Sequence, residues 1–326
     1  MKIAITGSTG HIAASLIPLL VQKGHSVRAL VYEQNPAFDL SAIEIVKGNI
    51  TKPSSLDAFV AGCEVVIHCA AKISINSNND PSVYETNVAG TKNIFNASKE
   101  AGIRRFIYIS SIHAYEQRPS GELLNEESNY CADSAAGYDR SKRDAEKFVL
   151  QQASAKMEVV VLNPTGVVGP PDYRVSLMGQ AIMDIYNKKV PSLIKGGFNF
   201  CDVRDVANGI MQAITKGKSG QSYFLSGKWI SLADLHKMIM HIKADQKWLP
   251  VLPGWAAYAG LPFIRLIAGI KKQQPLYTRE SLDALIHGNK NVSNLKASQE
   301  LCYTCRPISE TITDAINWYK QANMLL

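Results

Sequence analysis

The chain has 326 residues, more than one small hydrophobic core usually needs, so we expect a large domain with a smaller companion lobe. Its composition, 46% hydrophobic and 19% charged, is typical of globular proteins and excludes fibrous and disordered classes. The net charge of +7 is spread along the chain without a run of five basic residues, which argues against nucleic acid as the main partner.

Short β-branched runs alternate with amphipathic stretches over the first half of the chain. Strands are predicted at 2–6, 26–31, 43–47, 65–68, 105–109 and 158–162. Helices are predicted around 11–23, 54–59, 81–100 and 134–152. This alternation predicts an α/β fold of the Rossmann type, a doubly wound parallel sheet covered by helices on both faces.

The pattern changes after residue 162, where the proline- and glycine-rich segments 163–166 and 169–172 interrupt it. We therefore expect residues 1–170 to form the dinucleotide-binding domain, with returning segments near 200–226. Residues 171–326 should form mainly a smaller, mostly helical substrate-binding lobe, placed beyond the strand ends where open α/β sheets bind their ligands.

A small-residue loop follows the first predicted strand and opens the first helix. It reads Gly7-Ser8-Thr9-Gly10-His11-Ile12-Ala13. Gly7 permits a tight turn, Gly10 lets the backbone approach a pyrophosphate, and Ala13 allows close packing of helix on strand. Free N–H groups of the helix N-terminus would then face the phosphates, so the sequence predicts a dinucleotide cofactor.

The end of the second predicted strand should select the coenzyme. A carboxylate there binds the ribose hydroxyls of NAD and repels the extra phosphate of NADP. Val31 occupies the expected position, and Arg28 on the same strand would attract a phosphate, so NADP(H) is favoured. Glu33 would still reach a ribose, which leaves NAD(H) as the alternative coenzyme.

A tyrosine and a lysine are spaced for proton transfer in the predicted helix 134–152. Tyr138 and Lys142 share one helix face because they are four residues apart. An ammonium beside a phenol lowers the phenol's pKa, so that tyrosine can exchange a proton with a carbinol oxygen. Ser111 follows the predicted strand 105–109, whose carboxyl end faces the same crevice, and would hydrogen-bond a substrate carbonyl.

With these motifs the chain resembles the extended short-chain dehydrogenase/reductase family over nearly its whole length. Besides the glycine loop, Ser110-Ser111 and the Tyr138/Lys142 pair, the matching segments are Val66–Ala71, Asn87–Asn93, Asn163–Pro170 and Cys201–Ala207. The stretches 111–115, 196–198 and 306–308 place the closest likeness in the dihydroflavonol reductase and hydroxysteroid dehydrogenase branch.

The resemblance implies a role for each matching residue. Tyr138 would be the general acid/base, Lys142 would bind the nicotinamide ribose, and Ser111 would orient the substrate oxygen. Asn87 would steady the active-site helix and relay protons. The remaining implied cofactor contacts are Asn49 and Ile50 near adenine, Ala70 and Ala71 near the riboses, Lys72 near an anion, and Pro164 and Val167 beside the nicotinamide. Asn49 departs from the frequent aspartate, and Lys72 is also readily explained as a surface lysine.

These observations predict an NAD(P)-dependent enzyme that interconverts a carbonyl and an alcohol on a small, fairly apolar molecule. A nucleotide-sugar epimerase with tightly bound NAD is the main alternative. Sugar dehydratases of this family carry carboxylates after the serine, where this chain has Ile112 and His113. A non-catalytic dinucleotide sensor is a further alternative, although such proteins tend to lack the Tyr138/Lys142 pair.

The remaining expectations concern surroundings and partners. The six scattered cysteines and the absence of an apolar leader favour the reducing cytoplasm. Cys302 and Cys305 form a C-x-x-C without a second pair, so no metal site is expected. The apolar stretch 248–270 contains three prolines and Arg265, which argues against an integral membrane segment and favours a lobe wall or a peripheral contact. A homodimer is compatible with the sequence.

Overall fold

The computed structural model describes residues 1–33, 41–73, 80–271 and 278–325, with the side chains of 263–271 left out. Its main feature is a parallel sheet of seven strands in the order β10-β6-β5-β4-β1-β2-β3. The strands are β1 (Lys2–Thr6), β2 (Ser26–Val31), β3 (Ile43–Lys47), β4 (Val65–His68), β5 (Arg105–Ile109), β6 (Glu158–Pro164) and β10 (Gln221–Leu225). The predicted Rossmann-type fold is confirmed, and the strand order reverses between β1 and β4, where such sheets bind their ligands.

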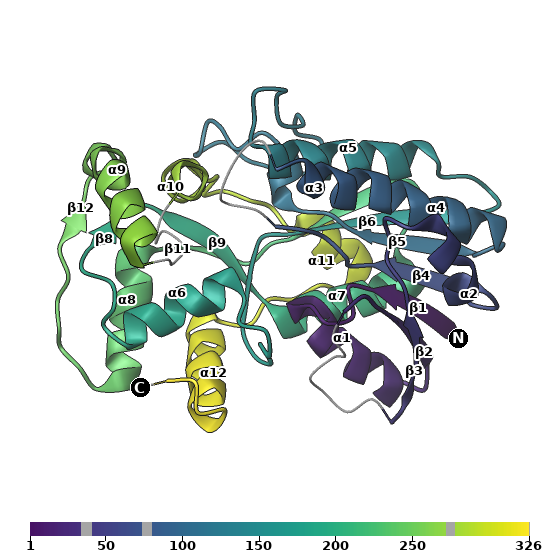
Figure 1. Ribbon diagram of the computed structural model, residues 1–326, viewed down its shortest axis with the longest axis horizontal. Helices are drawn as coiled ribbons and strands as arrows, with labels where there is room; N and C mark the ends of the chain where they lie inside the picture. Colours follow the sequence, from purple (N-terminus) through teal and green to yellow (C-terminus); the bar gives the residue numbers. More distant parts are fainter. Residues whose placement is uncertain (34–40, 74–79, 272–277, 326) are drawn as a thin grey trace.

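Helices cover both faces of this sheet (Figure 1). One face carries α1 (His11–Gln22), α7 (Val203–Lys216) and α11 (Leu295–Leu301), which bury a cluster that includes Leu16, Ile210 and Leu301. The opposite face carries α2 (Asp57–Val60), α4 (Gly90–Glu100) and α5 (Gly137–Gln151), which bury a second cluster. Except for the edge strand β3, the strands are largely buried, as their apolar runs require.

The helix predicted over 81–100 is interrupted. It consists of α3 (Pro81–Tyr84), a π-helical turn (Glu85–Ala89) and α4. The helix expected at 54–59 is likewise shorter, because a 3-10 turn (Pro53–Ser55) precedes α2. A further 3-10 turn, Ile112–Ala114, follows β5.

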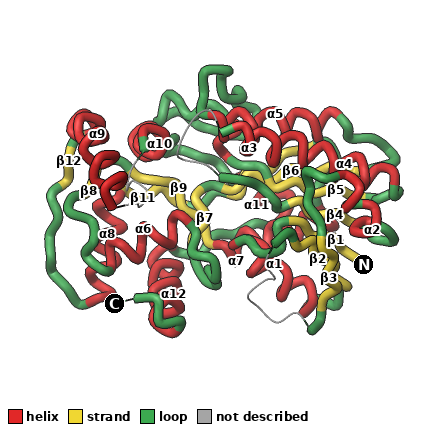
Figure 2. The backbone as a smooth tube through the Cα atoms, in the orientation of Figure 1, coloured by secondary structure: helices red, strands yellow, loops and turns green. Residues whose placement is uncertain are grey.

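The second lobe lies at the opposite end of the molecule from the N-terminus and is mostly helical, as Figure 2 shows. Its helices are α6 (Leu177–Tyr186), α8 (Leu232–Lys243), α9 (Gly254–Lys271), α10 (Arg279–His287) and α12 (Ile308–Gln321). Two small sheets complete it, β11 (Lys228–Ser231) with β9 (Gly197–Asp202) and β7 (Gly166–Val168), and β12 (Val251–Leu252) with β8 (Leu193–Ile194). These helices enclose a hydrophobic core of their own.

The apolar stretch 248–270 divides between the lobe core and the surface, as far as its side chains are described. Leu249, Ala257 and Leu261 are buried in the lobe core, whereas Trp248 and Trp255 are exposed. None of the helices in the described part of the chain has the length and apolar character needed to span a bilayer.

Cys302 ends α11 at a helix-to-loop junction, and both it and Cys305 are free thiols.

Candidate active site

The glycine loop lies at the carboxyl ends of β1 and β4. Gly7 has φ +68°, and a Cβ there would lie 2.6 Å from the backbone nitrogen of Ala70, so this loop and the end of β4 can meet only with glycine at this position. A Cβ at Gly10 would instead meet only the Gly7 carbonyl, at 3.2 Å, and otherwise point into open space.

The first turn of α1 therefore presents its backbone to an open approach, and no side chain caps this helix terminus. Free N–H groups at an uncovered helix N-terminus suit a pyrophosphate, so the loop fits a dinucleotide. Gly10 is exposed and Thr9 is half-buried, which leaves the outer part of the loop accessible.

Two loop side chains are engaged within the protein. The Ser8 hydroxyl is buried and donates to the Leu30 carbonyl, 2.7 Å away, so it braces the loop against β2. The His11 ring nitrogen Nε2 lies 2.7 Å from the carbonyl oxygen of Gly169, which follows β7. Ile12 packs against the core beneath the sheet. The loop is thus held in place before any ligand binds.

Arg28 does not occupy the place expected of it. Its side chain points to the α2 face of the sheet, where Nη1 donates to the carbonyls of Ala58, Phe59 and Ala61 at 2.7–3.1 Å. Its Nε lies 2.9 Å from a carboxylate oxygen of Glu44 on β3. The assignment of Arg28 to a cofactor phosphate was therefore wrong, because the guanidinium is buried and already bonded at the end of a helix.

The residues expected near adenine, Asn49 and Ile50, form a compact turn after β3. The Asn49 side chain accepts from the Thr51 backbone, and Ile50 packs against Gly90 at the start of α4. The Asn93 amide donates to the Ile50 carbonyl at 3.0 Å. Asn49 is only partly buried, so one side of this turn remains open.

The segment directly after β4 is held by hydrogen bonds and an ion pair to its neighbours. The Ala70 backbone donates to the Thr6 hydroxyl, and Ala71 is exposed. The Lys72 ammonium pairs with Asp80 at 3.1 Å and with the Ser82 hydroxyl. These partners fit the surface-lysine interpretation of Lys72 and disfavour its assignment to a ligand anion.

Ser111 and Tyr138 come together at the carboxyl end of β5. Ser111 directly precedes the 3-10 turn, and Tyr138 lies in the first turn of α5. Burial raises the pKa of the Tyr138 phenol to about 12, and a hydrogen bond with the Ser111 side chain acts in the opposite direction. The two hydroxyls are therefore within hydrogen-bonding reach of one another, as a carbonyl-binding pair must be.

Lys142 differs in part from expectation. Its ammonium is buried, donates to the Ile109 carbonyl at 2.8 Å and lies 3.3 Å from the Tyr108 hydroxyl. Burial lowers the pKa of Lys142 to about 8, while Glu146 raises it. The expected lowering of the Tyr138 pKa by Lys142 was wrong for this structure, because the ammonium is bonded to β5 and burial dominates the phenol.

Asn87 links the π-helical turn to the active-site helix. It is fully buried, and its amide nitrogen donates to the Ser141 hydroxyl of α5 at 2.9 Å and to the Lys72 carbonyl at 3.0 Å. Its amide oxygen accepts from the Lys72 backbone at 2.8 Å. These bonds connect the segment directly after β4 to α5 and agree with a steadying role.

The sequence analysis did not identify Glu146, a buried carboxylate on the same helix as Tyr138 and Lys142. It accepts hydrogen bonds from Asn163 at 2.6 Å, Tyr115 at 2.8 Å and Ser222 at 3.1 Å, and burial raises its pKa. The signal was present, since Glu146 continues the four-residue spacing of Tyr138 and Lys142 along one helix face.

Sequence reasoning also missed an acidic residue next to Tyr138. The Asp139 carboxylate lies 3.4 Å from Nδ1 of His113, whose ring stands edge-on to Tyr138 with 6.2 Å between ring centres. Burial lowers the His113 pKa, but Asp139 outweighs it and the net shift is upward. His113 therefore lies beside Tyr138, and it forms an ion pair with Asp139 when its ring is protonated.

The two residues expected beside the nicotinamide lie at the end of β6 and in β7. Pro164 is buried at the last position of β6, and Val167 is half-buried in the middle of β7. Both lie on the segment that leads from the sheet into the second lobe. Among the described residues, no group of three or more His, Cys, Asp or Glu side chains is arranged to hold a metal ion.

Comparison with known proteins agrees with this geometry. "Sterol demethylase protein B" of Methylococcus capsulatus is 27% identical over 331 residues, which cover 100% of both chains. A "putative dihydroflavonol 4-reductase" of Synechocystis sp. is 29% identical and covers 97% of this chain and 94% of its own. The crystal structure of a protein called gox2253 superposes with a TM-score of 0.85 at 29% identity, covering 100% of this chain and 99% of the other.

The sequence profile of the NAD dependent epimerase/dehydratase family matches residues 3–225, which include the glycine loop, Ser111 and the Tyr138/Lys142 pair. This segment is more than half of the chain. The protein therefore belongs to the NAD dependent epimerase/dehydratase family and is an NAD(P)-dependent oxidoreductase of the extended short-chain dehydrogenase/reductase type.

Proposed function

We propose that this protein interconverts a ketone or aldehyde and the corresponding alcohol on a small, mainly apolar molecule. The observation that carries the proposal is the pairing of Ser111 and Tyr138 at the carboxyl end of β5, without a carboxylate at the two positions after Ser111. Two hydroxyls suffice to hold and protonate a carbonyl oxygen, whereas dehydration of a sugar needs a further acid.

Each residue has one task in this reaction. The Ser111 hydroxyl donates to the substrate carbonyl and orients it. The Tyr138 hydroxyl donates the proton that the oxygen gains on reduction and takes it back on oxidation. The coenzyme, when bound, supplies or accepts the hydride. Lys142 would hold the nicotinamide ribose through its buried ammonium.

Glu146 stabilises this arrangement through Lys142 and through hydrogen bonds to two strands. It lies one helical turn beyond Lys142 and favours the charged ammonium against the cost of burial. Its hydrogen bonds reach β6 through Asn163 and β10 through Ser222. We assign Glu146 as a positioning residue, because it acts through Lys142.

We propose NADP(H) as the favoured coenzyme. Arg28 no longer supports this choice, which now rests on the end of β2: the apolar Val31 is buried where a carboxylate would bind the ribose of NAD. Equal dissociation constants for NADPH and NADH, measured by calorimetry, would remove the proposal.

The substrate class is inferred from the names of related proteins. The relatives with the printed names "sterol demethylase protein B" and "dihydroflavonol 4-reductase" support a polycyclic or aromatic skeleton for the substrate of this chain. A nucleotide-sugar epimerase remains the second candidate, because the matching family includes epimerases and Ser111, Tyr138 and Lys142 would serve that reaction too.

Two measurements test the proposal together. With NADPH present, hydrophobic ketones or alcohols should raise the melting temperature and should change the nicotinamide absorbance, because a ligand of the folded state stabilises it. Tyr138→Phe should keep coenzyme binding and lose at least about a hundredfold in turnover. Stabilisation by UDP- or dTDP-sugars alone, without net coenzyme oxidation, would refute the reductase and favour the epimerase.

A further inference from the structure

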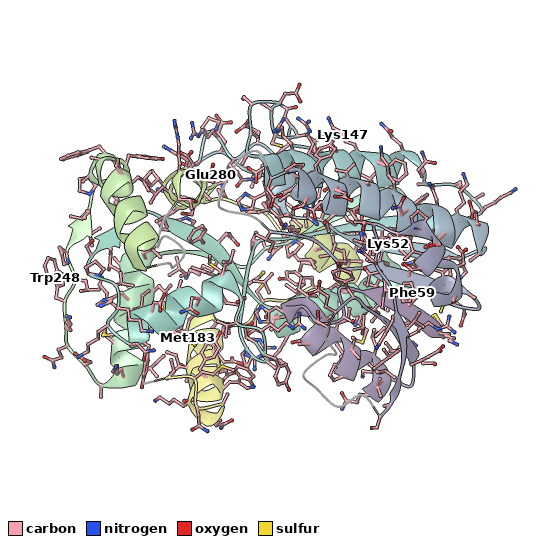
Figure 3. All side chains as sticks on the ribbon, in the orientation of Figure 1. Lys52, Phe59, Lys147, Met183, Trp248 and Glu280 are labelled. Atoms are coloured by element: carbon pink, nitrogen blue, oxygen red, sulfur yellow. The ribbon has the colours of Figure 1, made fainter. Side chains whose placement is uncertain are left out.

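The outer end of the second lobe exposes large apolar side chains. Trp248 and Trp255 are 76% and 75% exposed, and Val251 between them is 44% exposed. Figure 3 shows Trp248 at the outer margin of the molecule, on the loop that leads to β12. We call Trp248, Val251 and Trp255 the tip. Two indoles so exposed within eight residues are unusual on a surface that meets only water, because each leaves a large apolar area hydrated.

Helix α9, which contains Trp255 of the tip, is apolar on its outer side as well as on its inner side. In the first turns of α9, Ala257 and Leu261 face the lobe core. The outward positions Trp255, Ala259 and Pro262 are all exposed, and none is polar. A surface helix ordinarily places charged and polar residues on that side. This part of α9 therefore has a second apolar face that nothing in the described chain covers.

The unpaired charges described at the edge of the tip are positive. Two carboxylates nearby are engaged, since Asp245 pairs with Lys188 and Asp283 accepts from the Tyr258 hydroxyl. Lys247, next to Trp248, is exposed. Lys195 is exposed as well, and its backbone nitrogen donates to the Leu252 carbonyl at 2.8 Å, which places it beside β12. The apolar tip thus has exposed cations at its edges.

We propose that the tip docks on the surface of an anionic lipid bilayer, with Trp248 and Trp255 inserted at the headgroup level and the lysines facing lipid phosphates. Indoles favour the boundary between water and acyl chains, and basic residues are attracted by anionic headgroups. A second copy of the chain is a poorer occupant, because a twofold contact would bring the same cations together. The binding is peripheral, since no described helix can span the bilayer.

The proposal is independent of the reaction, so its test contains no substrate. The full-length protein is sedimented with vesicles of phosphatidylcholine, or of phosphatidylcholine with phosphatidylglycerol. Binding to the anionic vesicles should be at least about tenfold stronger, because several cations contribute, and it should weaken in high salt. The tryptophan emission should shift to the blue on binding, because the exposed indoles leave water.

Three variants make the result specific. Trp248→Ser with Trp255→Ser should lose at least about tenfold in vesicle binding and should lose the blue shift. Lys195→Glu with Lys247→Glu should lose the preference for anionic vesicles. Leu295→Ser removes a side chain that is 61% exposed on the Rossmann layer and should bind like the wild type. All three should melt close to the wild type, since every replaced side chain is exposed.

Four results would overturn the proposal. They are no binding of the wild type to anionic vesicles, equal binding of the double tryptophan variant, an equal loss in Leu295→Ser, and a dimer that the tryptophan changes convert to monomer by size-exclusion chromatography. The last would mean that a second copy covers the tip.

Discussion

Arg28 is predicted to stabilise the fold without selecting the coenzyme. Its guanidinium binds the last carbonyls of α2, and Arg28→Ala would leave buried acceptors without a donor. The free energy of unfolding should fall by about 1–3 kcal/mol, as for buried hydrogen-bonding groups that lose a partner. The ratio of NADPH to NADH affinities should stay within about twofold, well under the tenfold that 1.4 kcal/mol represents. Calorimetry measures the two coenzyme affinities, and denaturant unfolding measures the stability. If Arg28→Ala bound NADPH and NADH equally while the wild type preferred NADPH, the purely structural role of Arg28 would be contradicted.

The buried charge of Lys142 should lower the stability of the fold, although the same charge is expected to bind the coenzyme. Burial lowers its pKa from 10.5 to about 8, so the charged form costs the folded state roughly 3 kcal/mol below pH 8. That cost declines as the pH rises from about 8 to 10.5. Lys142→Met removes it, although the bond to the Ile109 carbonyl is lost too.

Lys142→Met should therefore melt no lower than the wild type at pH 7, and any advantage should shrink above pH 8. Coenzyme affinity should weaken in this variant at neutral pH. In the wild type, affinity should fall as the pH rises through about 8, because the ammonium loses its proton. Thermal melts and coenzyme titrations between pH 6 and 10 measure both. A variant that melts well below the wild type at pH 7 would show that the hydrogen bond outweighs the charge.

At the scale of elements, the glycine loop offers a matched pair of substitutions. Gly7→Ala should impair folding itself, because its φ is +68° and the new Cβ would collide with the Ala70 backbone. Gly10→Ala should leave the melting temperature of the free protein nearly unchanged but weaken coenzyme binding at least about tenfold, or 1.4 kcal/mol. Its Cβ would occupy the open space in front of α1. Equal coenzyme affinity in Gly10→Ala would show that the phosphates bind elsewhere.

The sequence predicts the strands well but not the contacts between distant residues. Five predicted strands agree with the structure at both ends, because apolar runs and the turns that bound them are local signals. The sequence could not show that Arg28 would bind α2. Side chains alternate along β2, so Arg28 lies on the same face of the sheet as Leu30. Only the folded structure shows that α2 packs on this face and accepts hydrogen bonds from Arg28. The Asp139–His113 pair likewise joins residues that are close only after folding.

At the scale of the whole molecule, the dinucleotide-binding layer should not fold alone. Ala297, Leu301 and Tyr303 pack in the same cluster as β1 and α1, and Arg306 pairs with Asp205 of α7 at 2.8 Å. A fragment of residues 1–226 would expose that part of the core. It should lack a cooperative thermal transition, and adding NADPH should not restore one. A cooperative melt of this fragment by circular dichroism would contradict the prediction.

The π-helical turn at Glu85–Ala89 imposes a fixed length on this stretch of chain. An α-helix advances by about 100° per residue, so one extra residue within a helix turns everything before it relative to everything after it. Deleting one residue there would leave a continuous helix and could preserve the packing of Ile94 and Phe95, yet Asn87 would swing away from Ser141. Insertions and deletions are therefore expected to be tolerated in surface loops of this protein but not between Tyr84 and Gly90. In that stretch the direction in which each side chain points around the helix axis must be kept.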